Sequence, residues 1–150
     1  MTRARDLADL GDSALGIESA WTTYTPTLTN VSIGNGTVVG RYKQVGKKVT
    51  VLVYVKWGST TSASGGFVIS LPVTGIASYS TYEPRFSSTI LDAGSAYYVG
   101  TLVLNSATKV DLLAILANGT YTSWTNVNAT TPFTWTTNDM FSYMFTYEAA

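Results

Sequence analysis

The acidic side chains are the first place to look for chemistry, because the chain contains neither histidine nor cysteine. Those two absences remove the commonest general base and every thiolate metal ligand. Only five carboxylates lie beyond residue 20. Glu83 and Asp92 are close in the sequence, in or near one predicted loop, and hydrolysis of a glycosidic bond needs two carboxylates roughly 5–9 Å apart. A depolymerase of bacterial surface glycans, with these two residues as its pair, is therefore one hypothesis.

Scattered carboxylates are also the ordinary state of a β-domain, and no other catalytic signature accompanies them. The sequence has no GxSxG motif, no Walker loop and no dinucleotide fingerprint. The string Gly34-Asn35-Gly36 is a turn signal, not a phosphate-binding loop. We therefore expect no catalytic residue, no metal ion and no cofactor, and we expect that the chain is not an enzyme.

Aromatic side chains in predicted loops are a second source of chemistry. Tyrosine and tryptophan combine an apolar face with a polar edge, which suits saccharides and protein interfaces alike. Tyr79, Tyr82 and Trp124 are the candidates for contact with a ligand such as a host surface glycan. Contact with another subunit, or a place at the rim of the core, is the alternative for the same residues. Tyr97 and Tyr98 must point to opposite faces of a strand, so one of them has to leave the core.

The composition is that of a β-protein in an assembly. The chain of 150 residues is 45% hydrophobic but only 12% charged, with nine basic and nine acidic residues. Without net charge, neither a nucleic acid nor an anionic membrane is an expected partner. No apolar run approaches the ~20 residues of a membrane helix, and no signal-peptide core is visible. We expect the protein to accumulate first in a cytoplasm.

The first 20 residues differ from the rest. Residues 2–20 hold four of the nine acidic residues, and leucines recur there at nearly helical spacing. We predict two parts: an N-terminal arm or short helix at residues 1–20 that attaches to another surface, and a β-domain at residues 21–150. A frayed polar tail is the alternative for the arm. The candidate attachment residues are Arg3, Arg5, Asp6, Leu7 and Leu10.

Period-two alternation predicts strands along the rest of the chain. The clearest strand is 47–57, where valines at 49, 51, 53 and 55 and Trp57 fall on one face. Loops are predicted at 58–66 and 74–86. The expected fold is an all-β, antiparallel β-sandwich of jelly-roll or Greek-key-like topology. The predicted strands are 21–29, 36–45, 47–57, 66–73, 85–94, 96–105, 109–117, 120–127 and 138–149.

The last strand carries the densest aromatic stripe in the chain, although chain ends usually fray. Large aromatic residues occupy every second position from Phe141 to Tyr147. We predict that this stripe enters the core and that the strand is a central one. The opposite face is smaller and softer, because methionine adapts to irregular contacts. That face is predicted to form a subunit interface with its neighbouring strand, through Leu52, Tyr54, Met140 and Met144.

Several motifs resemble a module of bacteriophage virion proteins. They are WTTYTP, the hairpin GNGTVVGRY, a Gly-Lys turn, a long alternating strand, a strand ending LPV, and PFTWTTND followed by a strand ending YEA. The resemblance covers nearly the whole chain in order. It implies a structural role in a virion, as a homotrimer bound to other virion proteins of the capsid or tail. It transfers no catalytic residue.

Two virion roles follow from this resemblance. The short arm and single domain, without a coiled coil or shaft repeats, favour a capsid decoration or head-fibre protein assembled in the host cytoplasm. The alternative is a tail-associated receptor-binding protein, in which loops 58–66 and 76–84 contact a host glycan.

Overall fold

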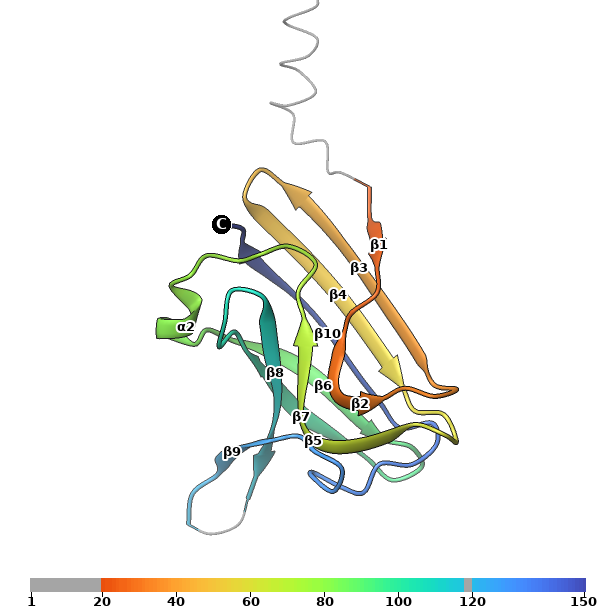
Figure 1. Ribbon diagram of the computed structural model, residues 1–150. Helices are drawn as coiled ribbons and strands as arrows, with labels where there is room; N and C mark the ends of the chain where they lie inside the picture. Colours follow the sequence, from red (N-terminus) through yellow and green to blue (C-terminus); the bar gives the residue numbers. More distant parts are fainter. Residues whose placement is uncertain (1–19, 118–119) are drawn as a thin grey trace, which may run out of the picture.

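The fold is all-β, and its strands form one antiparallel sheet (Figure 1). The computed structural model describes residues 20–117 and 120–150. Within these residues one short helix, α2 (Tyr79–Tyr82), lies between two strands. The strands are β1 (Thr22–Tyr24), β2 (Leu28–Ser32), β3 (Thr37–Val45), β4 (Lys48–Lys56), β5 (Ser62–Ser70), β6 (Arg85–Asp92), β7 (Ala96–Val103), β8 (Lys109–Leu116), β9 (Ser123–Asn126) and β10 (Met140–Glu148).

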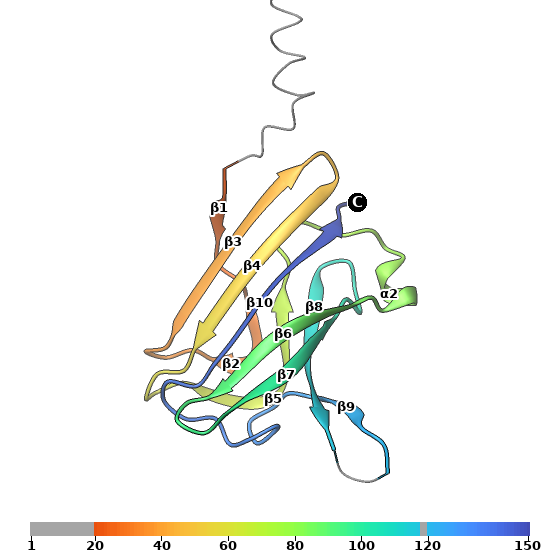
Figure 2. The ribbon, with the colours of Figure 1, turned by 180° about the vertical axis from the view of Figure 1, so that it is seen from behind.

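The sheet curls on itself. Its strand order is β1-β3-β4-β10-β6-β7-β8-β5-β2, and β9 pairs with the end of β8 that β5 leaves free. β1 and β2 stand at opposite ends of this order, yet only residues 25–27 join them. The two edges of the sheet therefore come together, as Figures 1 and 2 show. Strands β5 to β8 follow a Greek-key path, because β8, the last strand of the β6-β7-β8 meander, pairs with β5, which precedes the meander in the chain. The predicted all-β, sandwich-like fold is confirmed.

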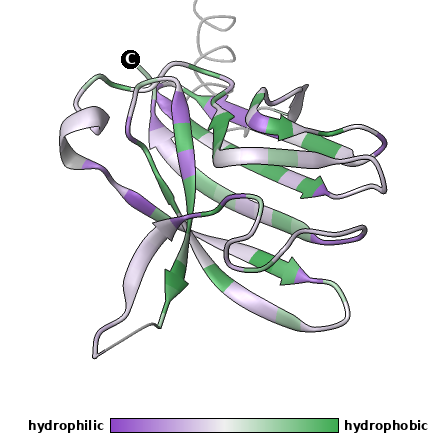
Figure 3. Cartoon of the chain, turned by 60° about the horizontal axis from the view of Figure 1, so that its bottom comes forward, coloured by the Kyte–Doolittle hydropathy of each residue, from purple (hydrophilic) through white to green (hydrophobic). Residues whose placement is uncertain are grey.

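β4 and β10 form the centre of the sheet. They pair along all nine residues, from Met140 opposite Lys56 to Glu148 opposite Lys48. The valines of β4 at 49, 51, 53 and 55 have no exposed surface, and the aromatic residues of β10 at 141, 143, 145 and 147 are at most 5% exposed. Bands of higher and lower hydropathy alternate along the strands (Figure 3). The prediction that the terminal aromatic stripe enters the core is therefore confirmed.

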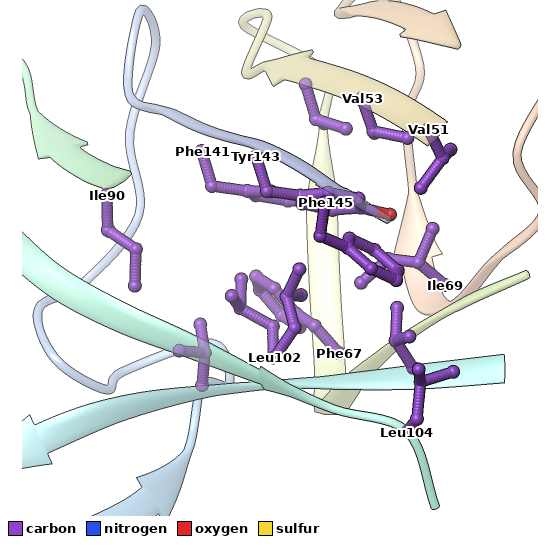
Figure 4. Close-up of a cluster of buried hydrophobic side chains, with 14 of the residues drawn as sticks. Val51, Val53, Phe67, Ile69, Ile90, Leu102, Leu104, Phe141, Tyr143 and Phe145 are labelled. Atoms are coloured by element: carbon purple, nitrogen blue, oxygen red, sulfur yellow. The ribbon is translucent and has the colours of Figure 1, made fainter. Parts of the chain in front are cut away.

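The core lies between facing halves of the curled sheet. Side chains of β4 and β10 on one side meet Phe67, Leu102 and Leu104 on the other (Figure 4). At one end an aromatic cluster closes the core, where the rings of Trp57 and Trp135 stack with centroids 4.4 Å apart. Such ring pairs add about 0.5–1.5 kcal/mol beyond the apolar area they bury.

The predicted first strand, 21–29, is divided into β1 and β2. Pro26 has no N–H to donate, and the chain changes from one sheet edge to the other beside it. The crossing passes directly over β3 at Gly40. A Cβ atom at Gly40 would lie 2.6 Å from the carbonyl oxygen of Tyr24 and 2.7 Å from Cδ of Pro26. Only glycine therefore lets the two edges come this close.

The predicted loop at 58–66 is wrong over half its length, because β5 begins at Ser62. Small residues there look flexible by composition, but their backbone pairs with β2. Ser62 lies opposite Ser32, and a bulge at Asn30 lets that side chain donate a hydrogen bond of 2.8 Å to the carbonyl oxygen of Gly66. The predicted loop at 74–86 likewise contains α2 and the first residues of β6.

Gly40→Ala should lower the free energy of unfolding by roughly 1–3 kcal/mol, because backbone atoms have to move to admit the methyl group. Gly66→Ala is the matched control, since its Cβ atom would meet Asn126 at an ordinary 3.6 Å. Urea denaturation of both variants measures the difference. Equal losses in the two variants would contradict the close crossing at Gly40.

A group of core tyrosines should make stability depend on alkaline pH. Burial, followed by the charges of Tyr24 and Tyr147, raises the pKa of Tyr143 well above its usual 10.0. Burial also raises the pKa of Tyr147 to about 12, against the effect of its hydrogen bond to the Val73 backbone. In the unfolded chain these hydroxyls ionise near pH 10, before the folded ones. The unfolded state therefore loses protons first, and the free energy of unfolding falls as pH rises above about 10.

Urea denaturation across this pH range tests the tyrosine effect. Tyr143→Phe should make the alkaline fall shallower, whereas Tyr121→Phe, at a side chain that is 86% exposed, should leave it unchanged. A flat profile in the parent protein up to about pH 12 would contradict the account.

Candidate interaction surface

The four residues predicted to form a subunit interface lie together on the outer face of the sheet. Leu52 of β4 is the cross-strand partner of Met144 of β10, and Tyr54 is the partner of Ser142. Met140 follows on the same face, opposite Lys56. Directly paired residues have Cβ atoms about 4.5–5.5 Å apart, so these side chains adjoin. Met144 is 62% exposed although it belongs to a central strand. The residues are thus brought together as expected, and their contact with another subunit stays a prediction.

A hollow of about 480 Å³ lies beside Leu52, Tyr54 and Met144. It exists because β10 pairs with β6 only from Met140 to Tyr143, after which the two strands separate. We call it the β4–β10 hollow. Its side chains on the outer face are Leu52, Tyr54, Ser87, Thr89, Ser142 and Met144.

Beyond β6, the outer face carries exposed apolar side chains. On β7, Tyr97 is 72% exposed and Val99 is 64% exposed, and we call these two residues the β7 ridge. Tyr98 points inward and packs against Phe133 with ring centroids 5.2 Å apart, so the predicted division of Tyr97 and Tyr98 is confirmed. Further along, Ile115 of β8 pairs with Trp124 of β9, and both are partly exposed.

Sequence reasoning missed Val99 and Ile115. Both faces of β7 and of β8 are rich in apolar residues, so alternation does not say which face points away from the core. The signal that could have found them is that both sets of alternate positions in these strands are apolar. A strand that is apolar on both faces needs a second buried surface or leaves one face exposed to water.

Charge on this face gathers at the side of the β3–β4 hairpin. Residues 37–56 contain five basic residues and no acidic one. Lys48 and Lys56 stand at the two ends of β4, and Arg41 of β3 pairs with Leu52, so the uncharged part of the face begins at β4 and extends toward β7. Lys43 places its amino nitrogen 5.5 Å from the centre of the Trp21 ring, a cation–π contact just where residues 1–20 join the domain.

Glu83 and Asp92, considered above as one hypothesis for a carboxylate pair, do not form one. Glu83 precedes β6, and Asp92 is its last residue. At about 3.3 Å per residue, the eight residues of β6 put roughly 23 Å between its ends. The two carboxyl groups of a glycosidase lie less than about 10 Å apart, so these two residues cannot act together on one glycosidic bond. The strand predicted at 85–94 forms β6, and its length separates two residues that are close in the sequence.

Glu83 is instead near Asp111 of β8. Burial is the main cause of the raised pKa of Asp111, the charge of Glu83 adds to it, and Lys109 opposes it. Asp111 also accepts a hydrogen bond from the amide of Asn105. Among residues 20–117 and 120–150, no three acidic side chains group so as to hold a metal ion.

The three candidate ligand-facing aromatics do not form one surface. Tyr79 is half-buried, and its hydroxyl accepts a hydrogen bond of 2.7 Å from the backbone N–H of Glu148. Trp124 lies on β9, away from α2 in both views (Figures 1 and 2). The side chain of Tyr82 lies outside the described residues. Tyr79 and Trp124 therefore do not share one surface, and contact of either residue with a ligand stays a prediction.

Asp139 is the one acidic residue without exposed surface in the described part of the chain. Its carboxylate accepts hydrogen bonds from the backbone N–H groups of Ala93 and Thr136, at 2.8 and 2.5 Å, and from the Thr136 hydroxyl at 3.2 Å. Its backbone carbonyl accepts from Trp57 N–H. Asp139 thus fastens the β6–β7 turn to the segment that leads into β10, which is a structural role.

Comparison with known proteins adds no relative. No model of a protein family matches the chain. No curated protein matches it either. In residues 20–117 and 120–150, no helix has the length and apolar character needed to cross a membrane. The predicted attachment residues Arg3, Arg5, Asp6, Leu7 and Leu10 lie outside the described residues.

Asp139→Ala should lower the free energy of unfolding by roughly 3 kcal/mol or more, because three donors lose their acceptor in a buried place. The matched control is Asp92→Asn at the neighbouring turn, where a half-exposed carboxylate should matter by less than about 0.5 kcal/mol. Guanidinium denaturation compares the two. A catalytic carboxylate gives the opposite pattern, in which its removal leaves stability intact.

Proposed function

We propose that this chain is a structural protein of a bacteriophage virion. In this proposal it is a small homotrimeric appendage, a capsid decoration or head-fibre protein, attached through residues 1–20. The motifs that resemble virion modules are compatible with this role, because their residues stabilise the fold and form no catalytic arrangement in the described part of the chain. The side chain of Asn35 donates a hydrogen bond to the Ser59 hydroxyl and accepts one from Thr60 N–H, at the end of the β3–β4 pair. Asp139 accepts a hydrogen bond from Thr136 N–H and so holds the segment before β10.

The uncharged middle of the outer face, from β4 to β7, is the observation that carries the proposal. A protein that stays alone in water seldom leaves Met144, Tyr97 and Val99 exposed on one face. The middle of that face, from β4 to β7, holds apolar and hydroxyl side chains without charge, and depletion of charge is typical of an interface core. Charged residues lie at the ends of β4 and on the neighbouring β3, where Arg41 pairs with Leu52. A subunit or virion protein that covers this face accounts for the pattern without any catalytic role.

Deletion of residues 2–20 tests the attachment role. The truncated chain keeps Trp21 and every strand, so it should fold and assemble like the full chain but should not be incorporated into phage particles. Immunoblotting of purified particles measures incorporation, and circular dichroism with mass measurement checks folding. Normal incorporation of the truncated protein would contradict attachment through the arm.

The alternative is a tail-associated receptor-binding protein. Tyr121 is 86% exposed and Trp124 is 43% exposed, so this part of the chain presents aromatic side chains to solvent. The two loops first considered for glycan contact do not favour it, because residues 58–61 and α2 lie on opposite sides of the molecule (Figures 1 and 2).

The two roles predict different behaviour of the purified protein. A receptor-binding protein should bind host cells and block infection, and Tyr121→Ala with Trp124→Ala should abolish both effects. An appendage of the capsid should do neither, and antibody labelling should place it on the head. Labelling of the tail together with cell binding would replace the capsid role by receptor binding. Absence of label from the particles would contradict a virion role altogether.

A further inference from the structure

The β4–β10 hollow and the β7 ridge lie on the same outer face but have opposite shapes. The hollow is concave, with about 480 Å³ of space between β10 and β6. The ridge projects from the next strand, where Val99 is the cross-strand partner of Thr89 at the border of the hollow. A projection and a recess of matching chemistry on one chain are what a contact between identical copies requires.

The lining of the hollow fits the side chains of the ridge. Leu52 and Met144 supply apolar walls, and Met144 adapts its shape to what it meets. Ser87, Thr89 and Ser142 supply hydroxyl groups. A tyrosine such as Tyr97 presents an apolar ring and one hydroxyl, so it can satisfy both kinds of wall. The volume lies at the low end of the range for binding sites, which suits one or two side chains better than a polymer.

Charge decides which surfaces can meet. The hollow lies beside the β3–β4 hairpin, with five basic residues and no acidic one in residues 37–56. The ridge lies in residues 83–117, which hold three acidic and two basic residues. Two hollows face to face would bring two basic hairpins together, and like charges oppose such a contact. A ridge against a hollow instead sets the basic hairpin beside a segment of mixed charge, which avoids this repulsion.

We propose that the β4–β10 hollow of one copy receives the β7 ridge of the next copy. The contact joins two different surfaces, so it repeats head to tail and closes into a ring. The curl of the sheet between β4 and β7 supports closure, because it turns the two surfaces in different directions (Figures 1 and 2). This inference rests on the proposed function only for the number of copies, three.

The absence of cysteine makes a disulfide test direct. One variant carries Tyr97→Cys and Met144→Cys together, and two others carry one change each. Both positions are mostly exposed, so folding should be preserved. Within one chain the two sites are separated by two strand spacings and four residues along β10, at least roughly 13 Å. A bond within one chain is therefore excluded, because disulfides need Cα atoms closer than about 7 Å.

After mild oxidation, the double variant should run as three linked chains on a non-reducing gel. Each single variant should stay unlinked on its own. A mixture of the Tyr97→Cys variant with the Met144→Cys variant should give linked pairs. Linked pairs from Met144→Cys alone would overturn the proposal, since like surfaces would then meet. A double variant that stops at two chains would overturn the head-to-tail ring and the trimer together. No linkage at all in a protein of trimeric mass would place the interface elsewhere and leave the proposed function standing.

A second measurement does not depend on disulfide geometry. Val99→Glu puts a charge on the ridge and should lower the assembled mass to that of single chains. Tyr121→Glu is the control, because Tyr121 is 86% exposed just before β9, outside the hollow, the ridge and the basic hairpin. Unchanged assembly in Val99→Glu, or loss of assembly in both variants, would overturn the proposal.

Discussion

The pairing of the last strand, β10, with β4 is the constraint on which the rest of the structure depends. β10 pairs along its whole length with β4 and over its first half with β6, so it joins the two halves of the curled sheet. Its aromatic residues fill the core between those halves. Even the last residues are held, because Ala149 N–H donates to the carbonyl oxygen of Lys47 and Ala150 N–H to that of Thr74. An end that normally frays is therefore the centre of this fold.

The same pairing shapes the outer face. A strand that is aromatic on one face must present its other residues to the outside, which puts Met144 beside Leu52. Where β6 separates from β10, the outer face is hollowed, and where β7 follows, it rises again. The proposed interface thus follows from the way the core is filled. No separate binding loop is needed to create it.

Sequence patterns predicted what depends on neighbouring residues and missed what depends on distant ones. The alternation in 47–57 and 141–147 predicted β4, β10 and the buried stripe, since period two needs no knowledge of the partner strand. The start of β5 was missed because only pairing with β2 orders its small residues. The strand predicted at 85–94 became β6, and it separates Glu83 from Asp92 although they are close in the sequence. The β7 ridge was missed because both faces of β7 are apolar.

The central claim is that this outer face meets another copy of the same chain. The most direct test is the mass of the full-length protein in solution, by native mass spectrometry and sedimentation at several concentrations. The account predicts a species of three times 16.1 kDa that persists on dilution. A protein that stays at 16.1 kDa at every concentration would contradict it, and the exposed apolar face would then need a different partner.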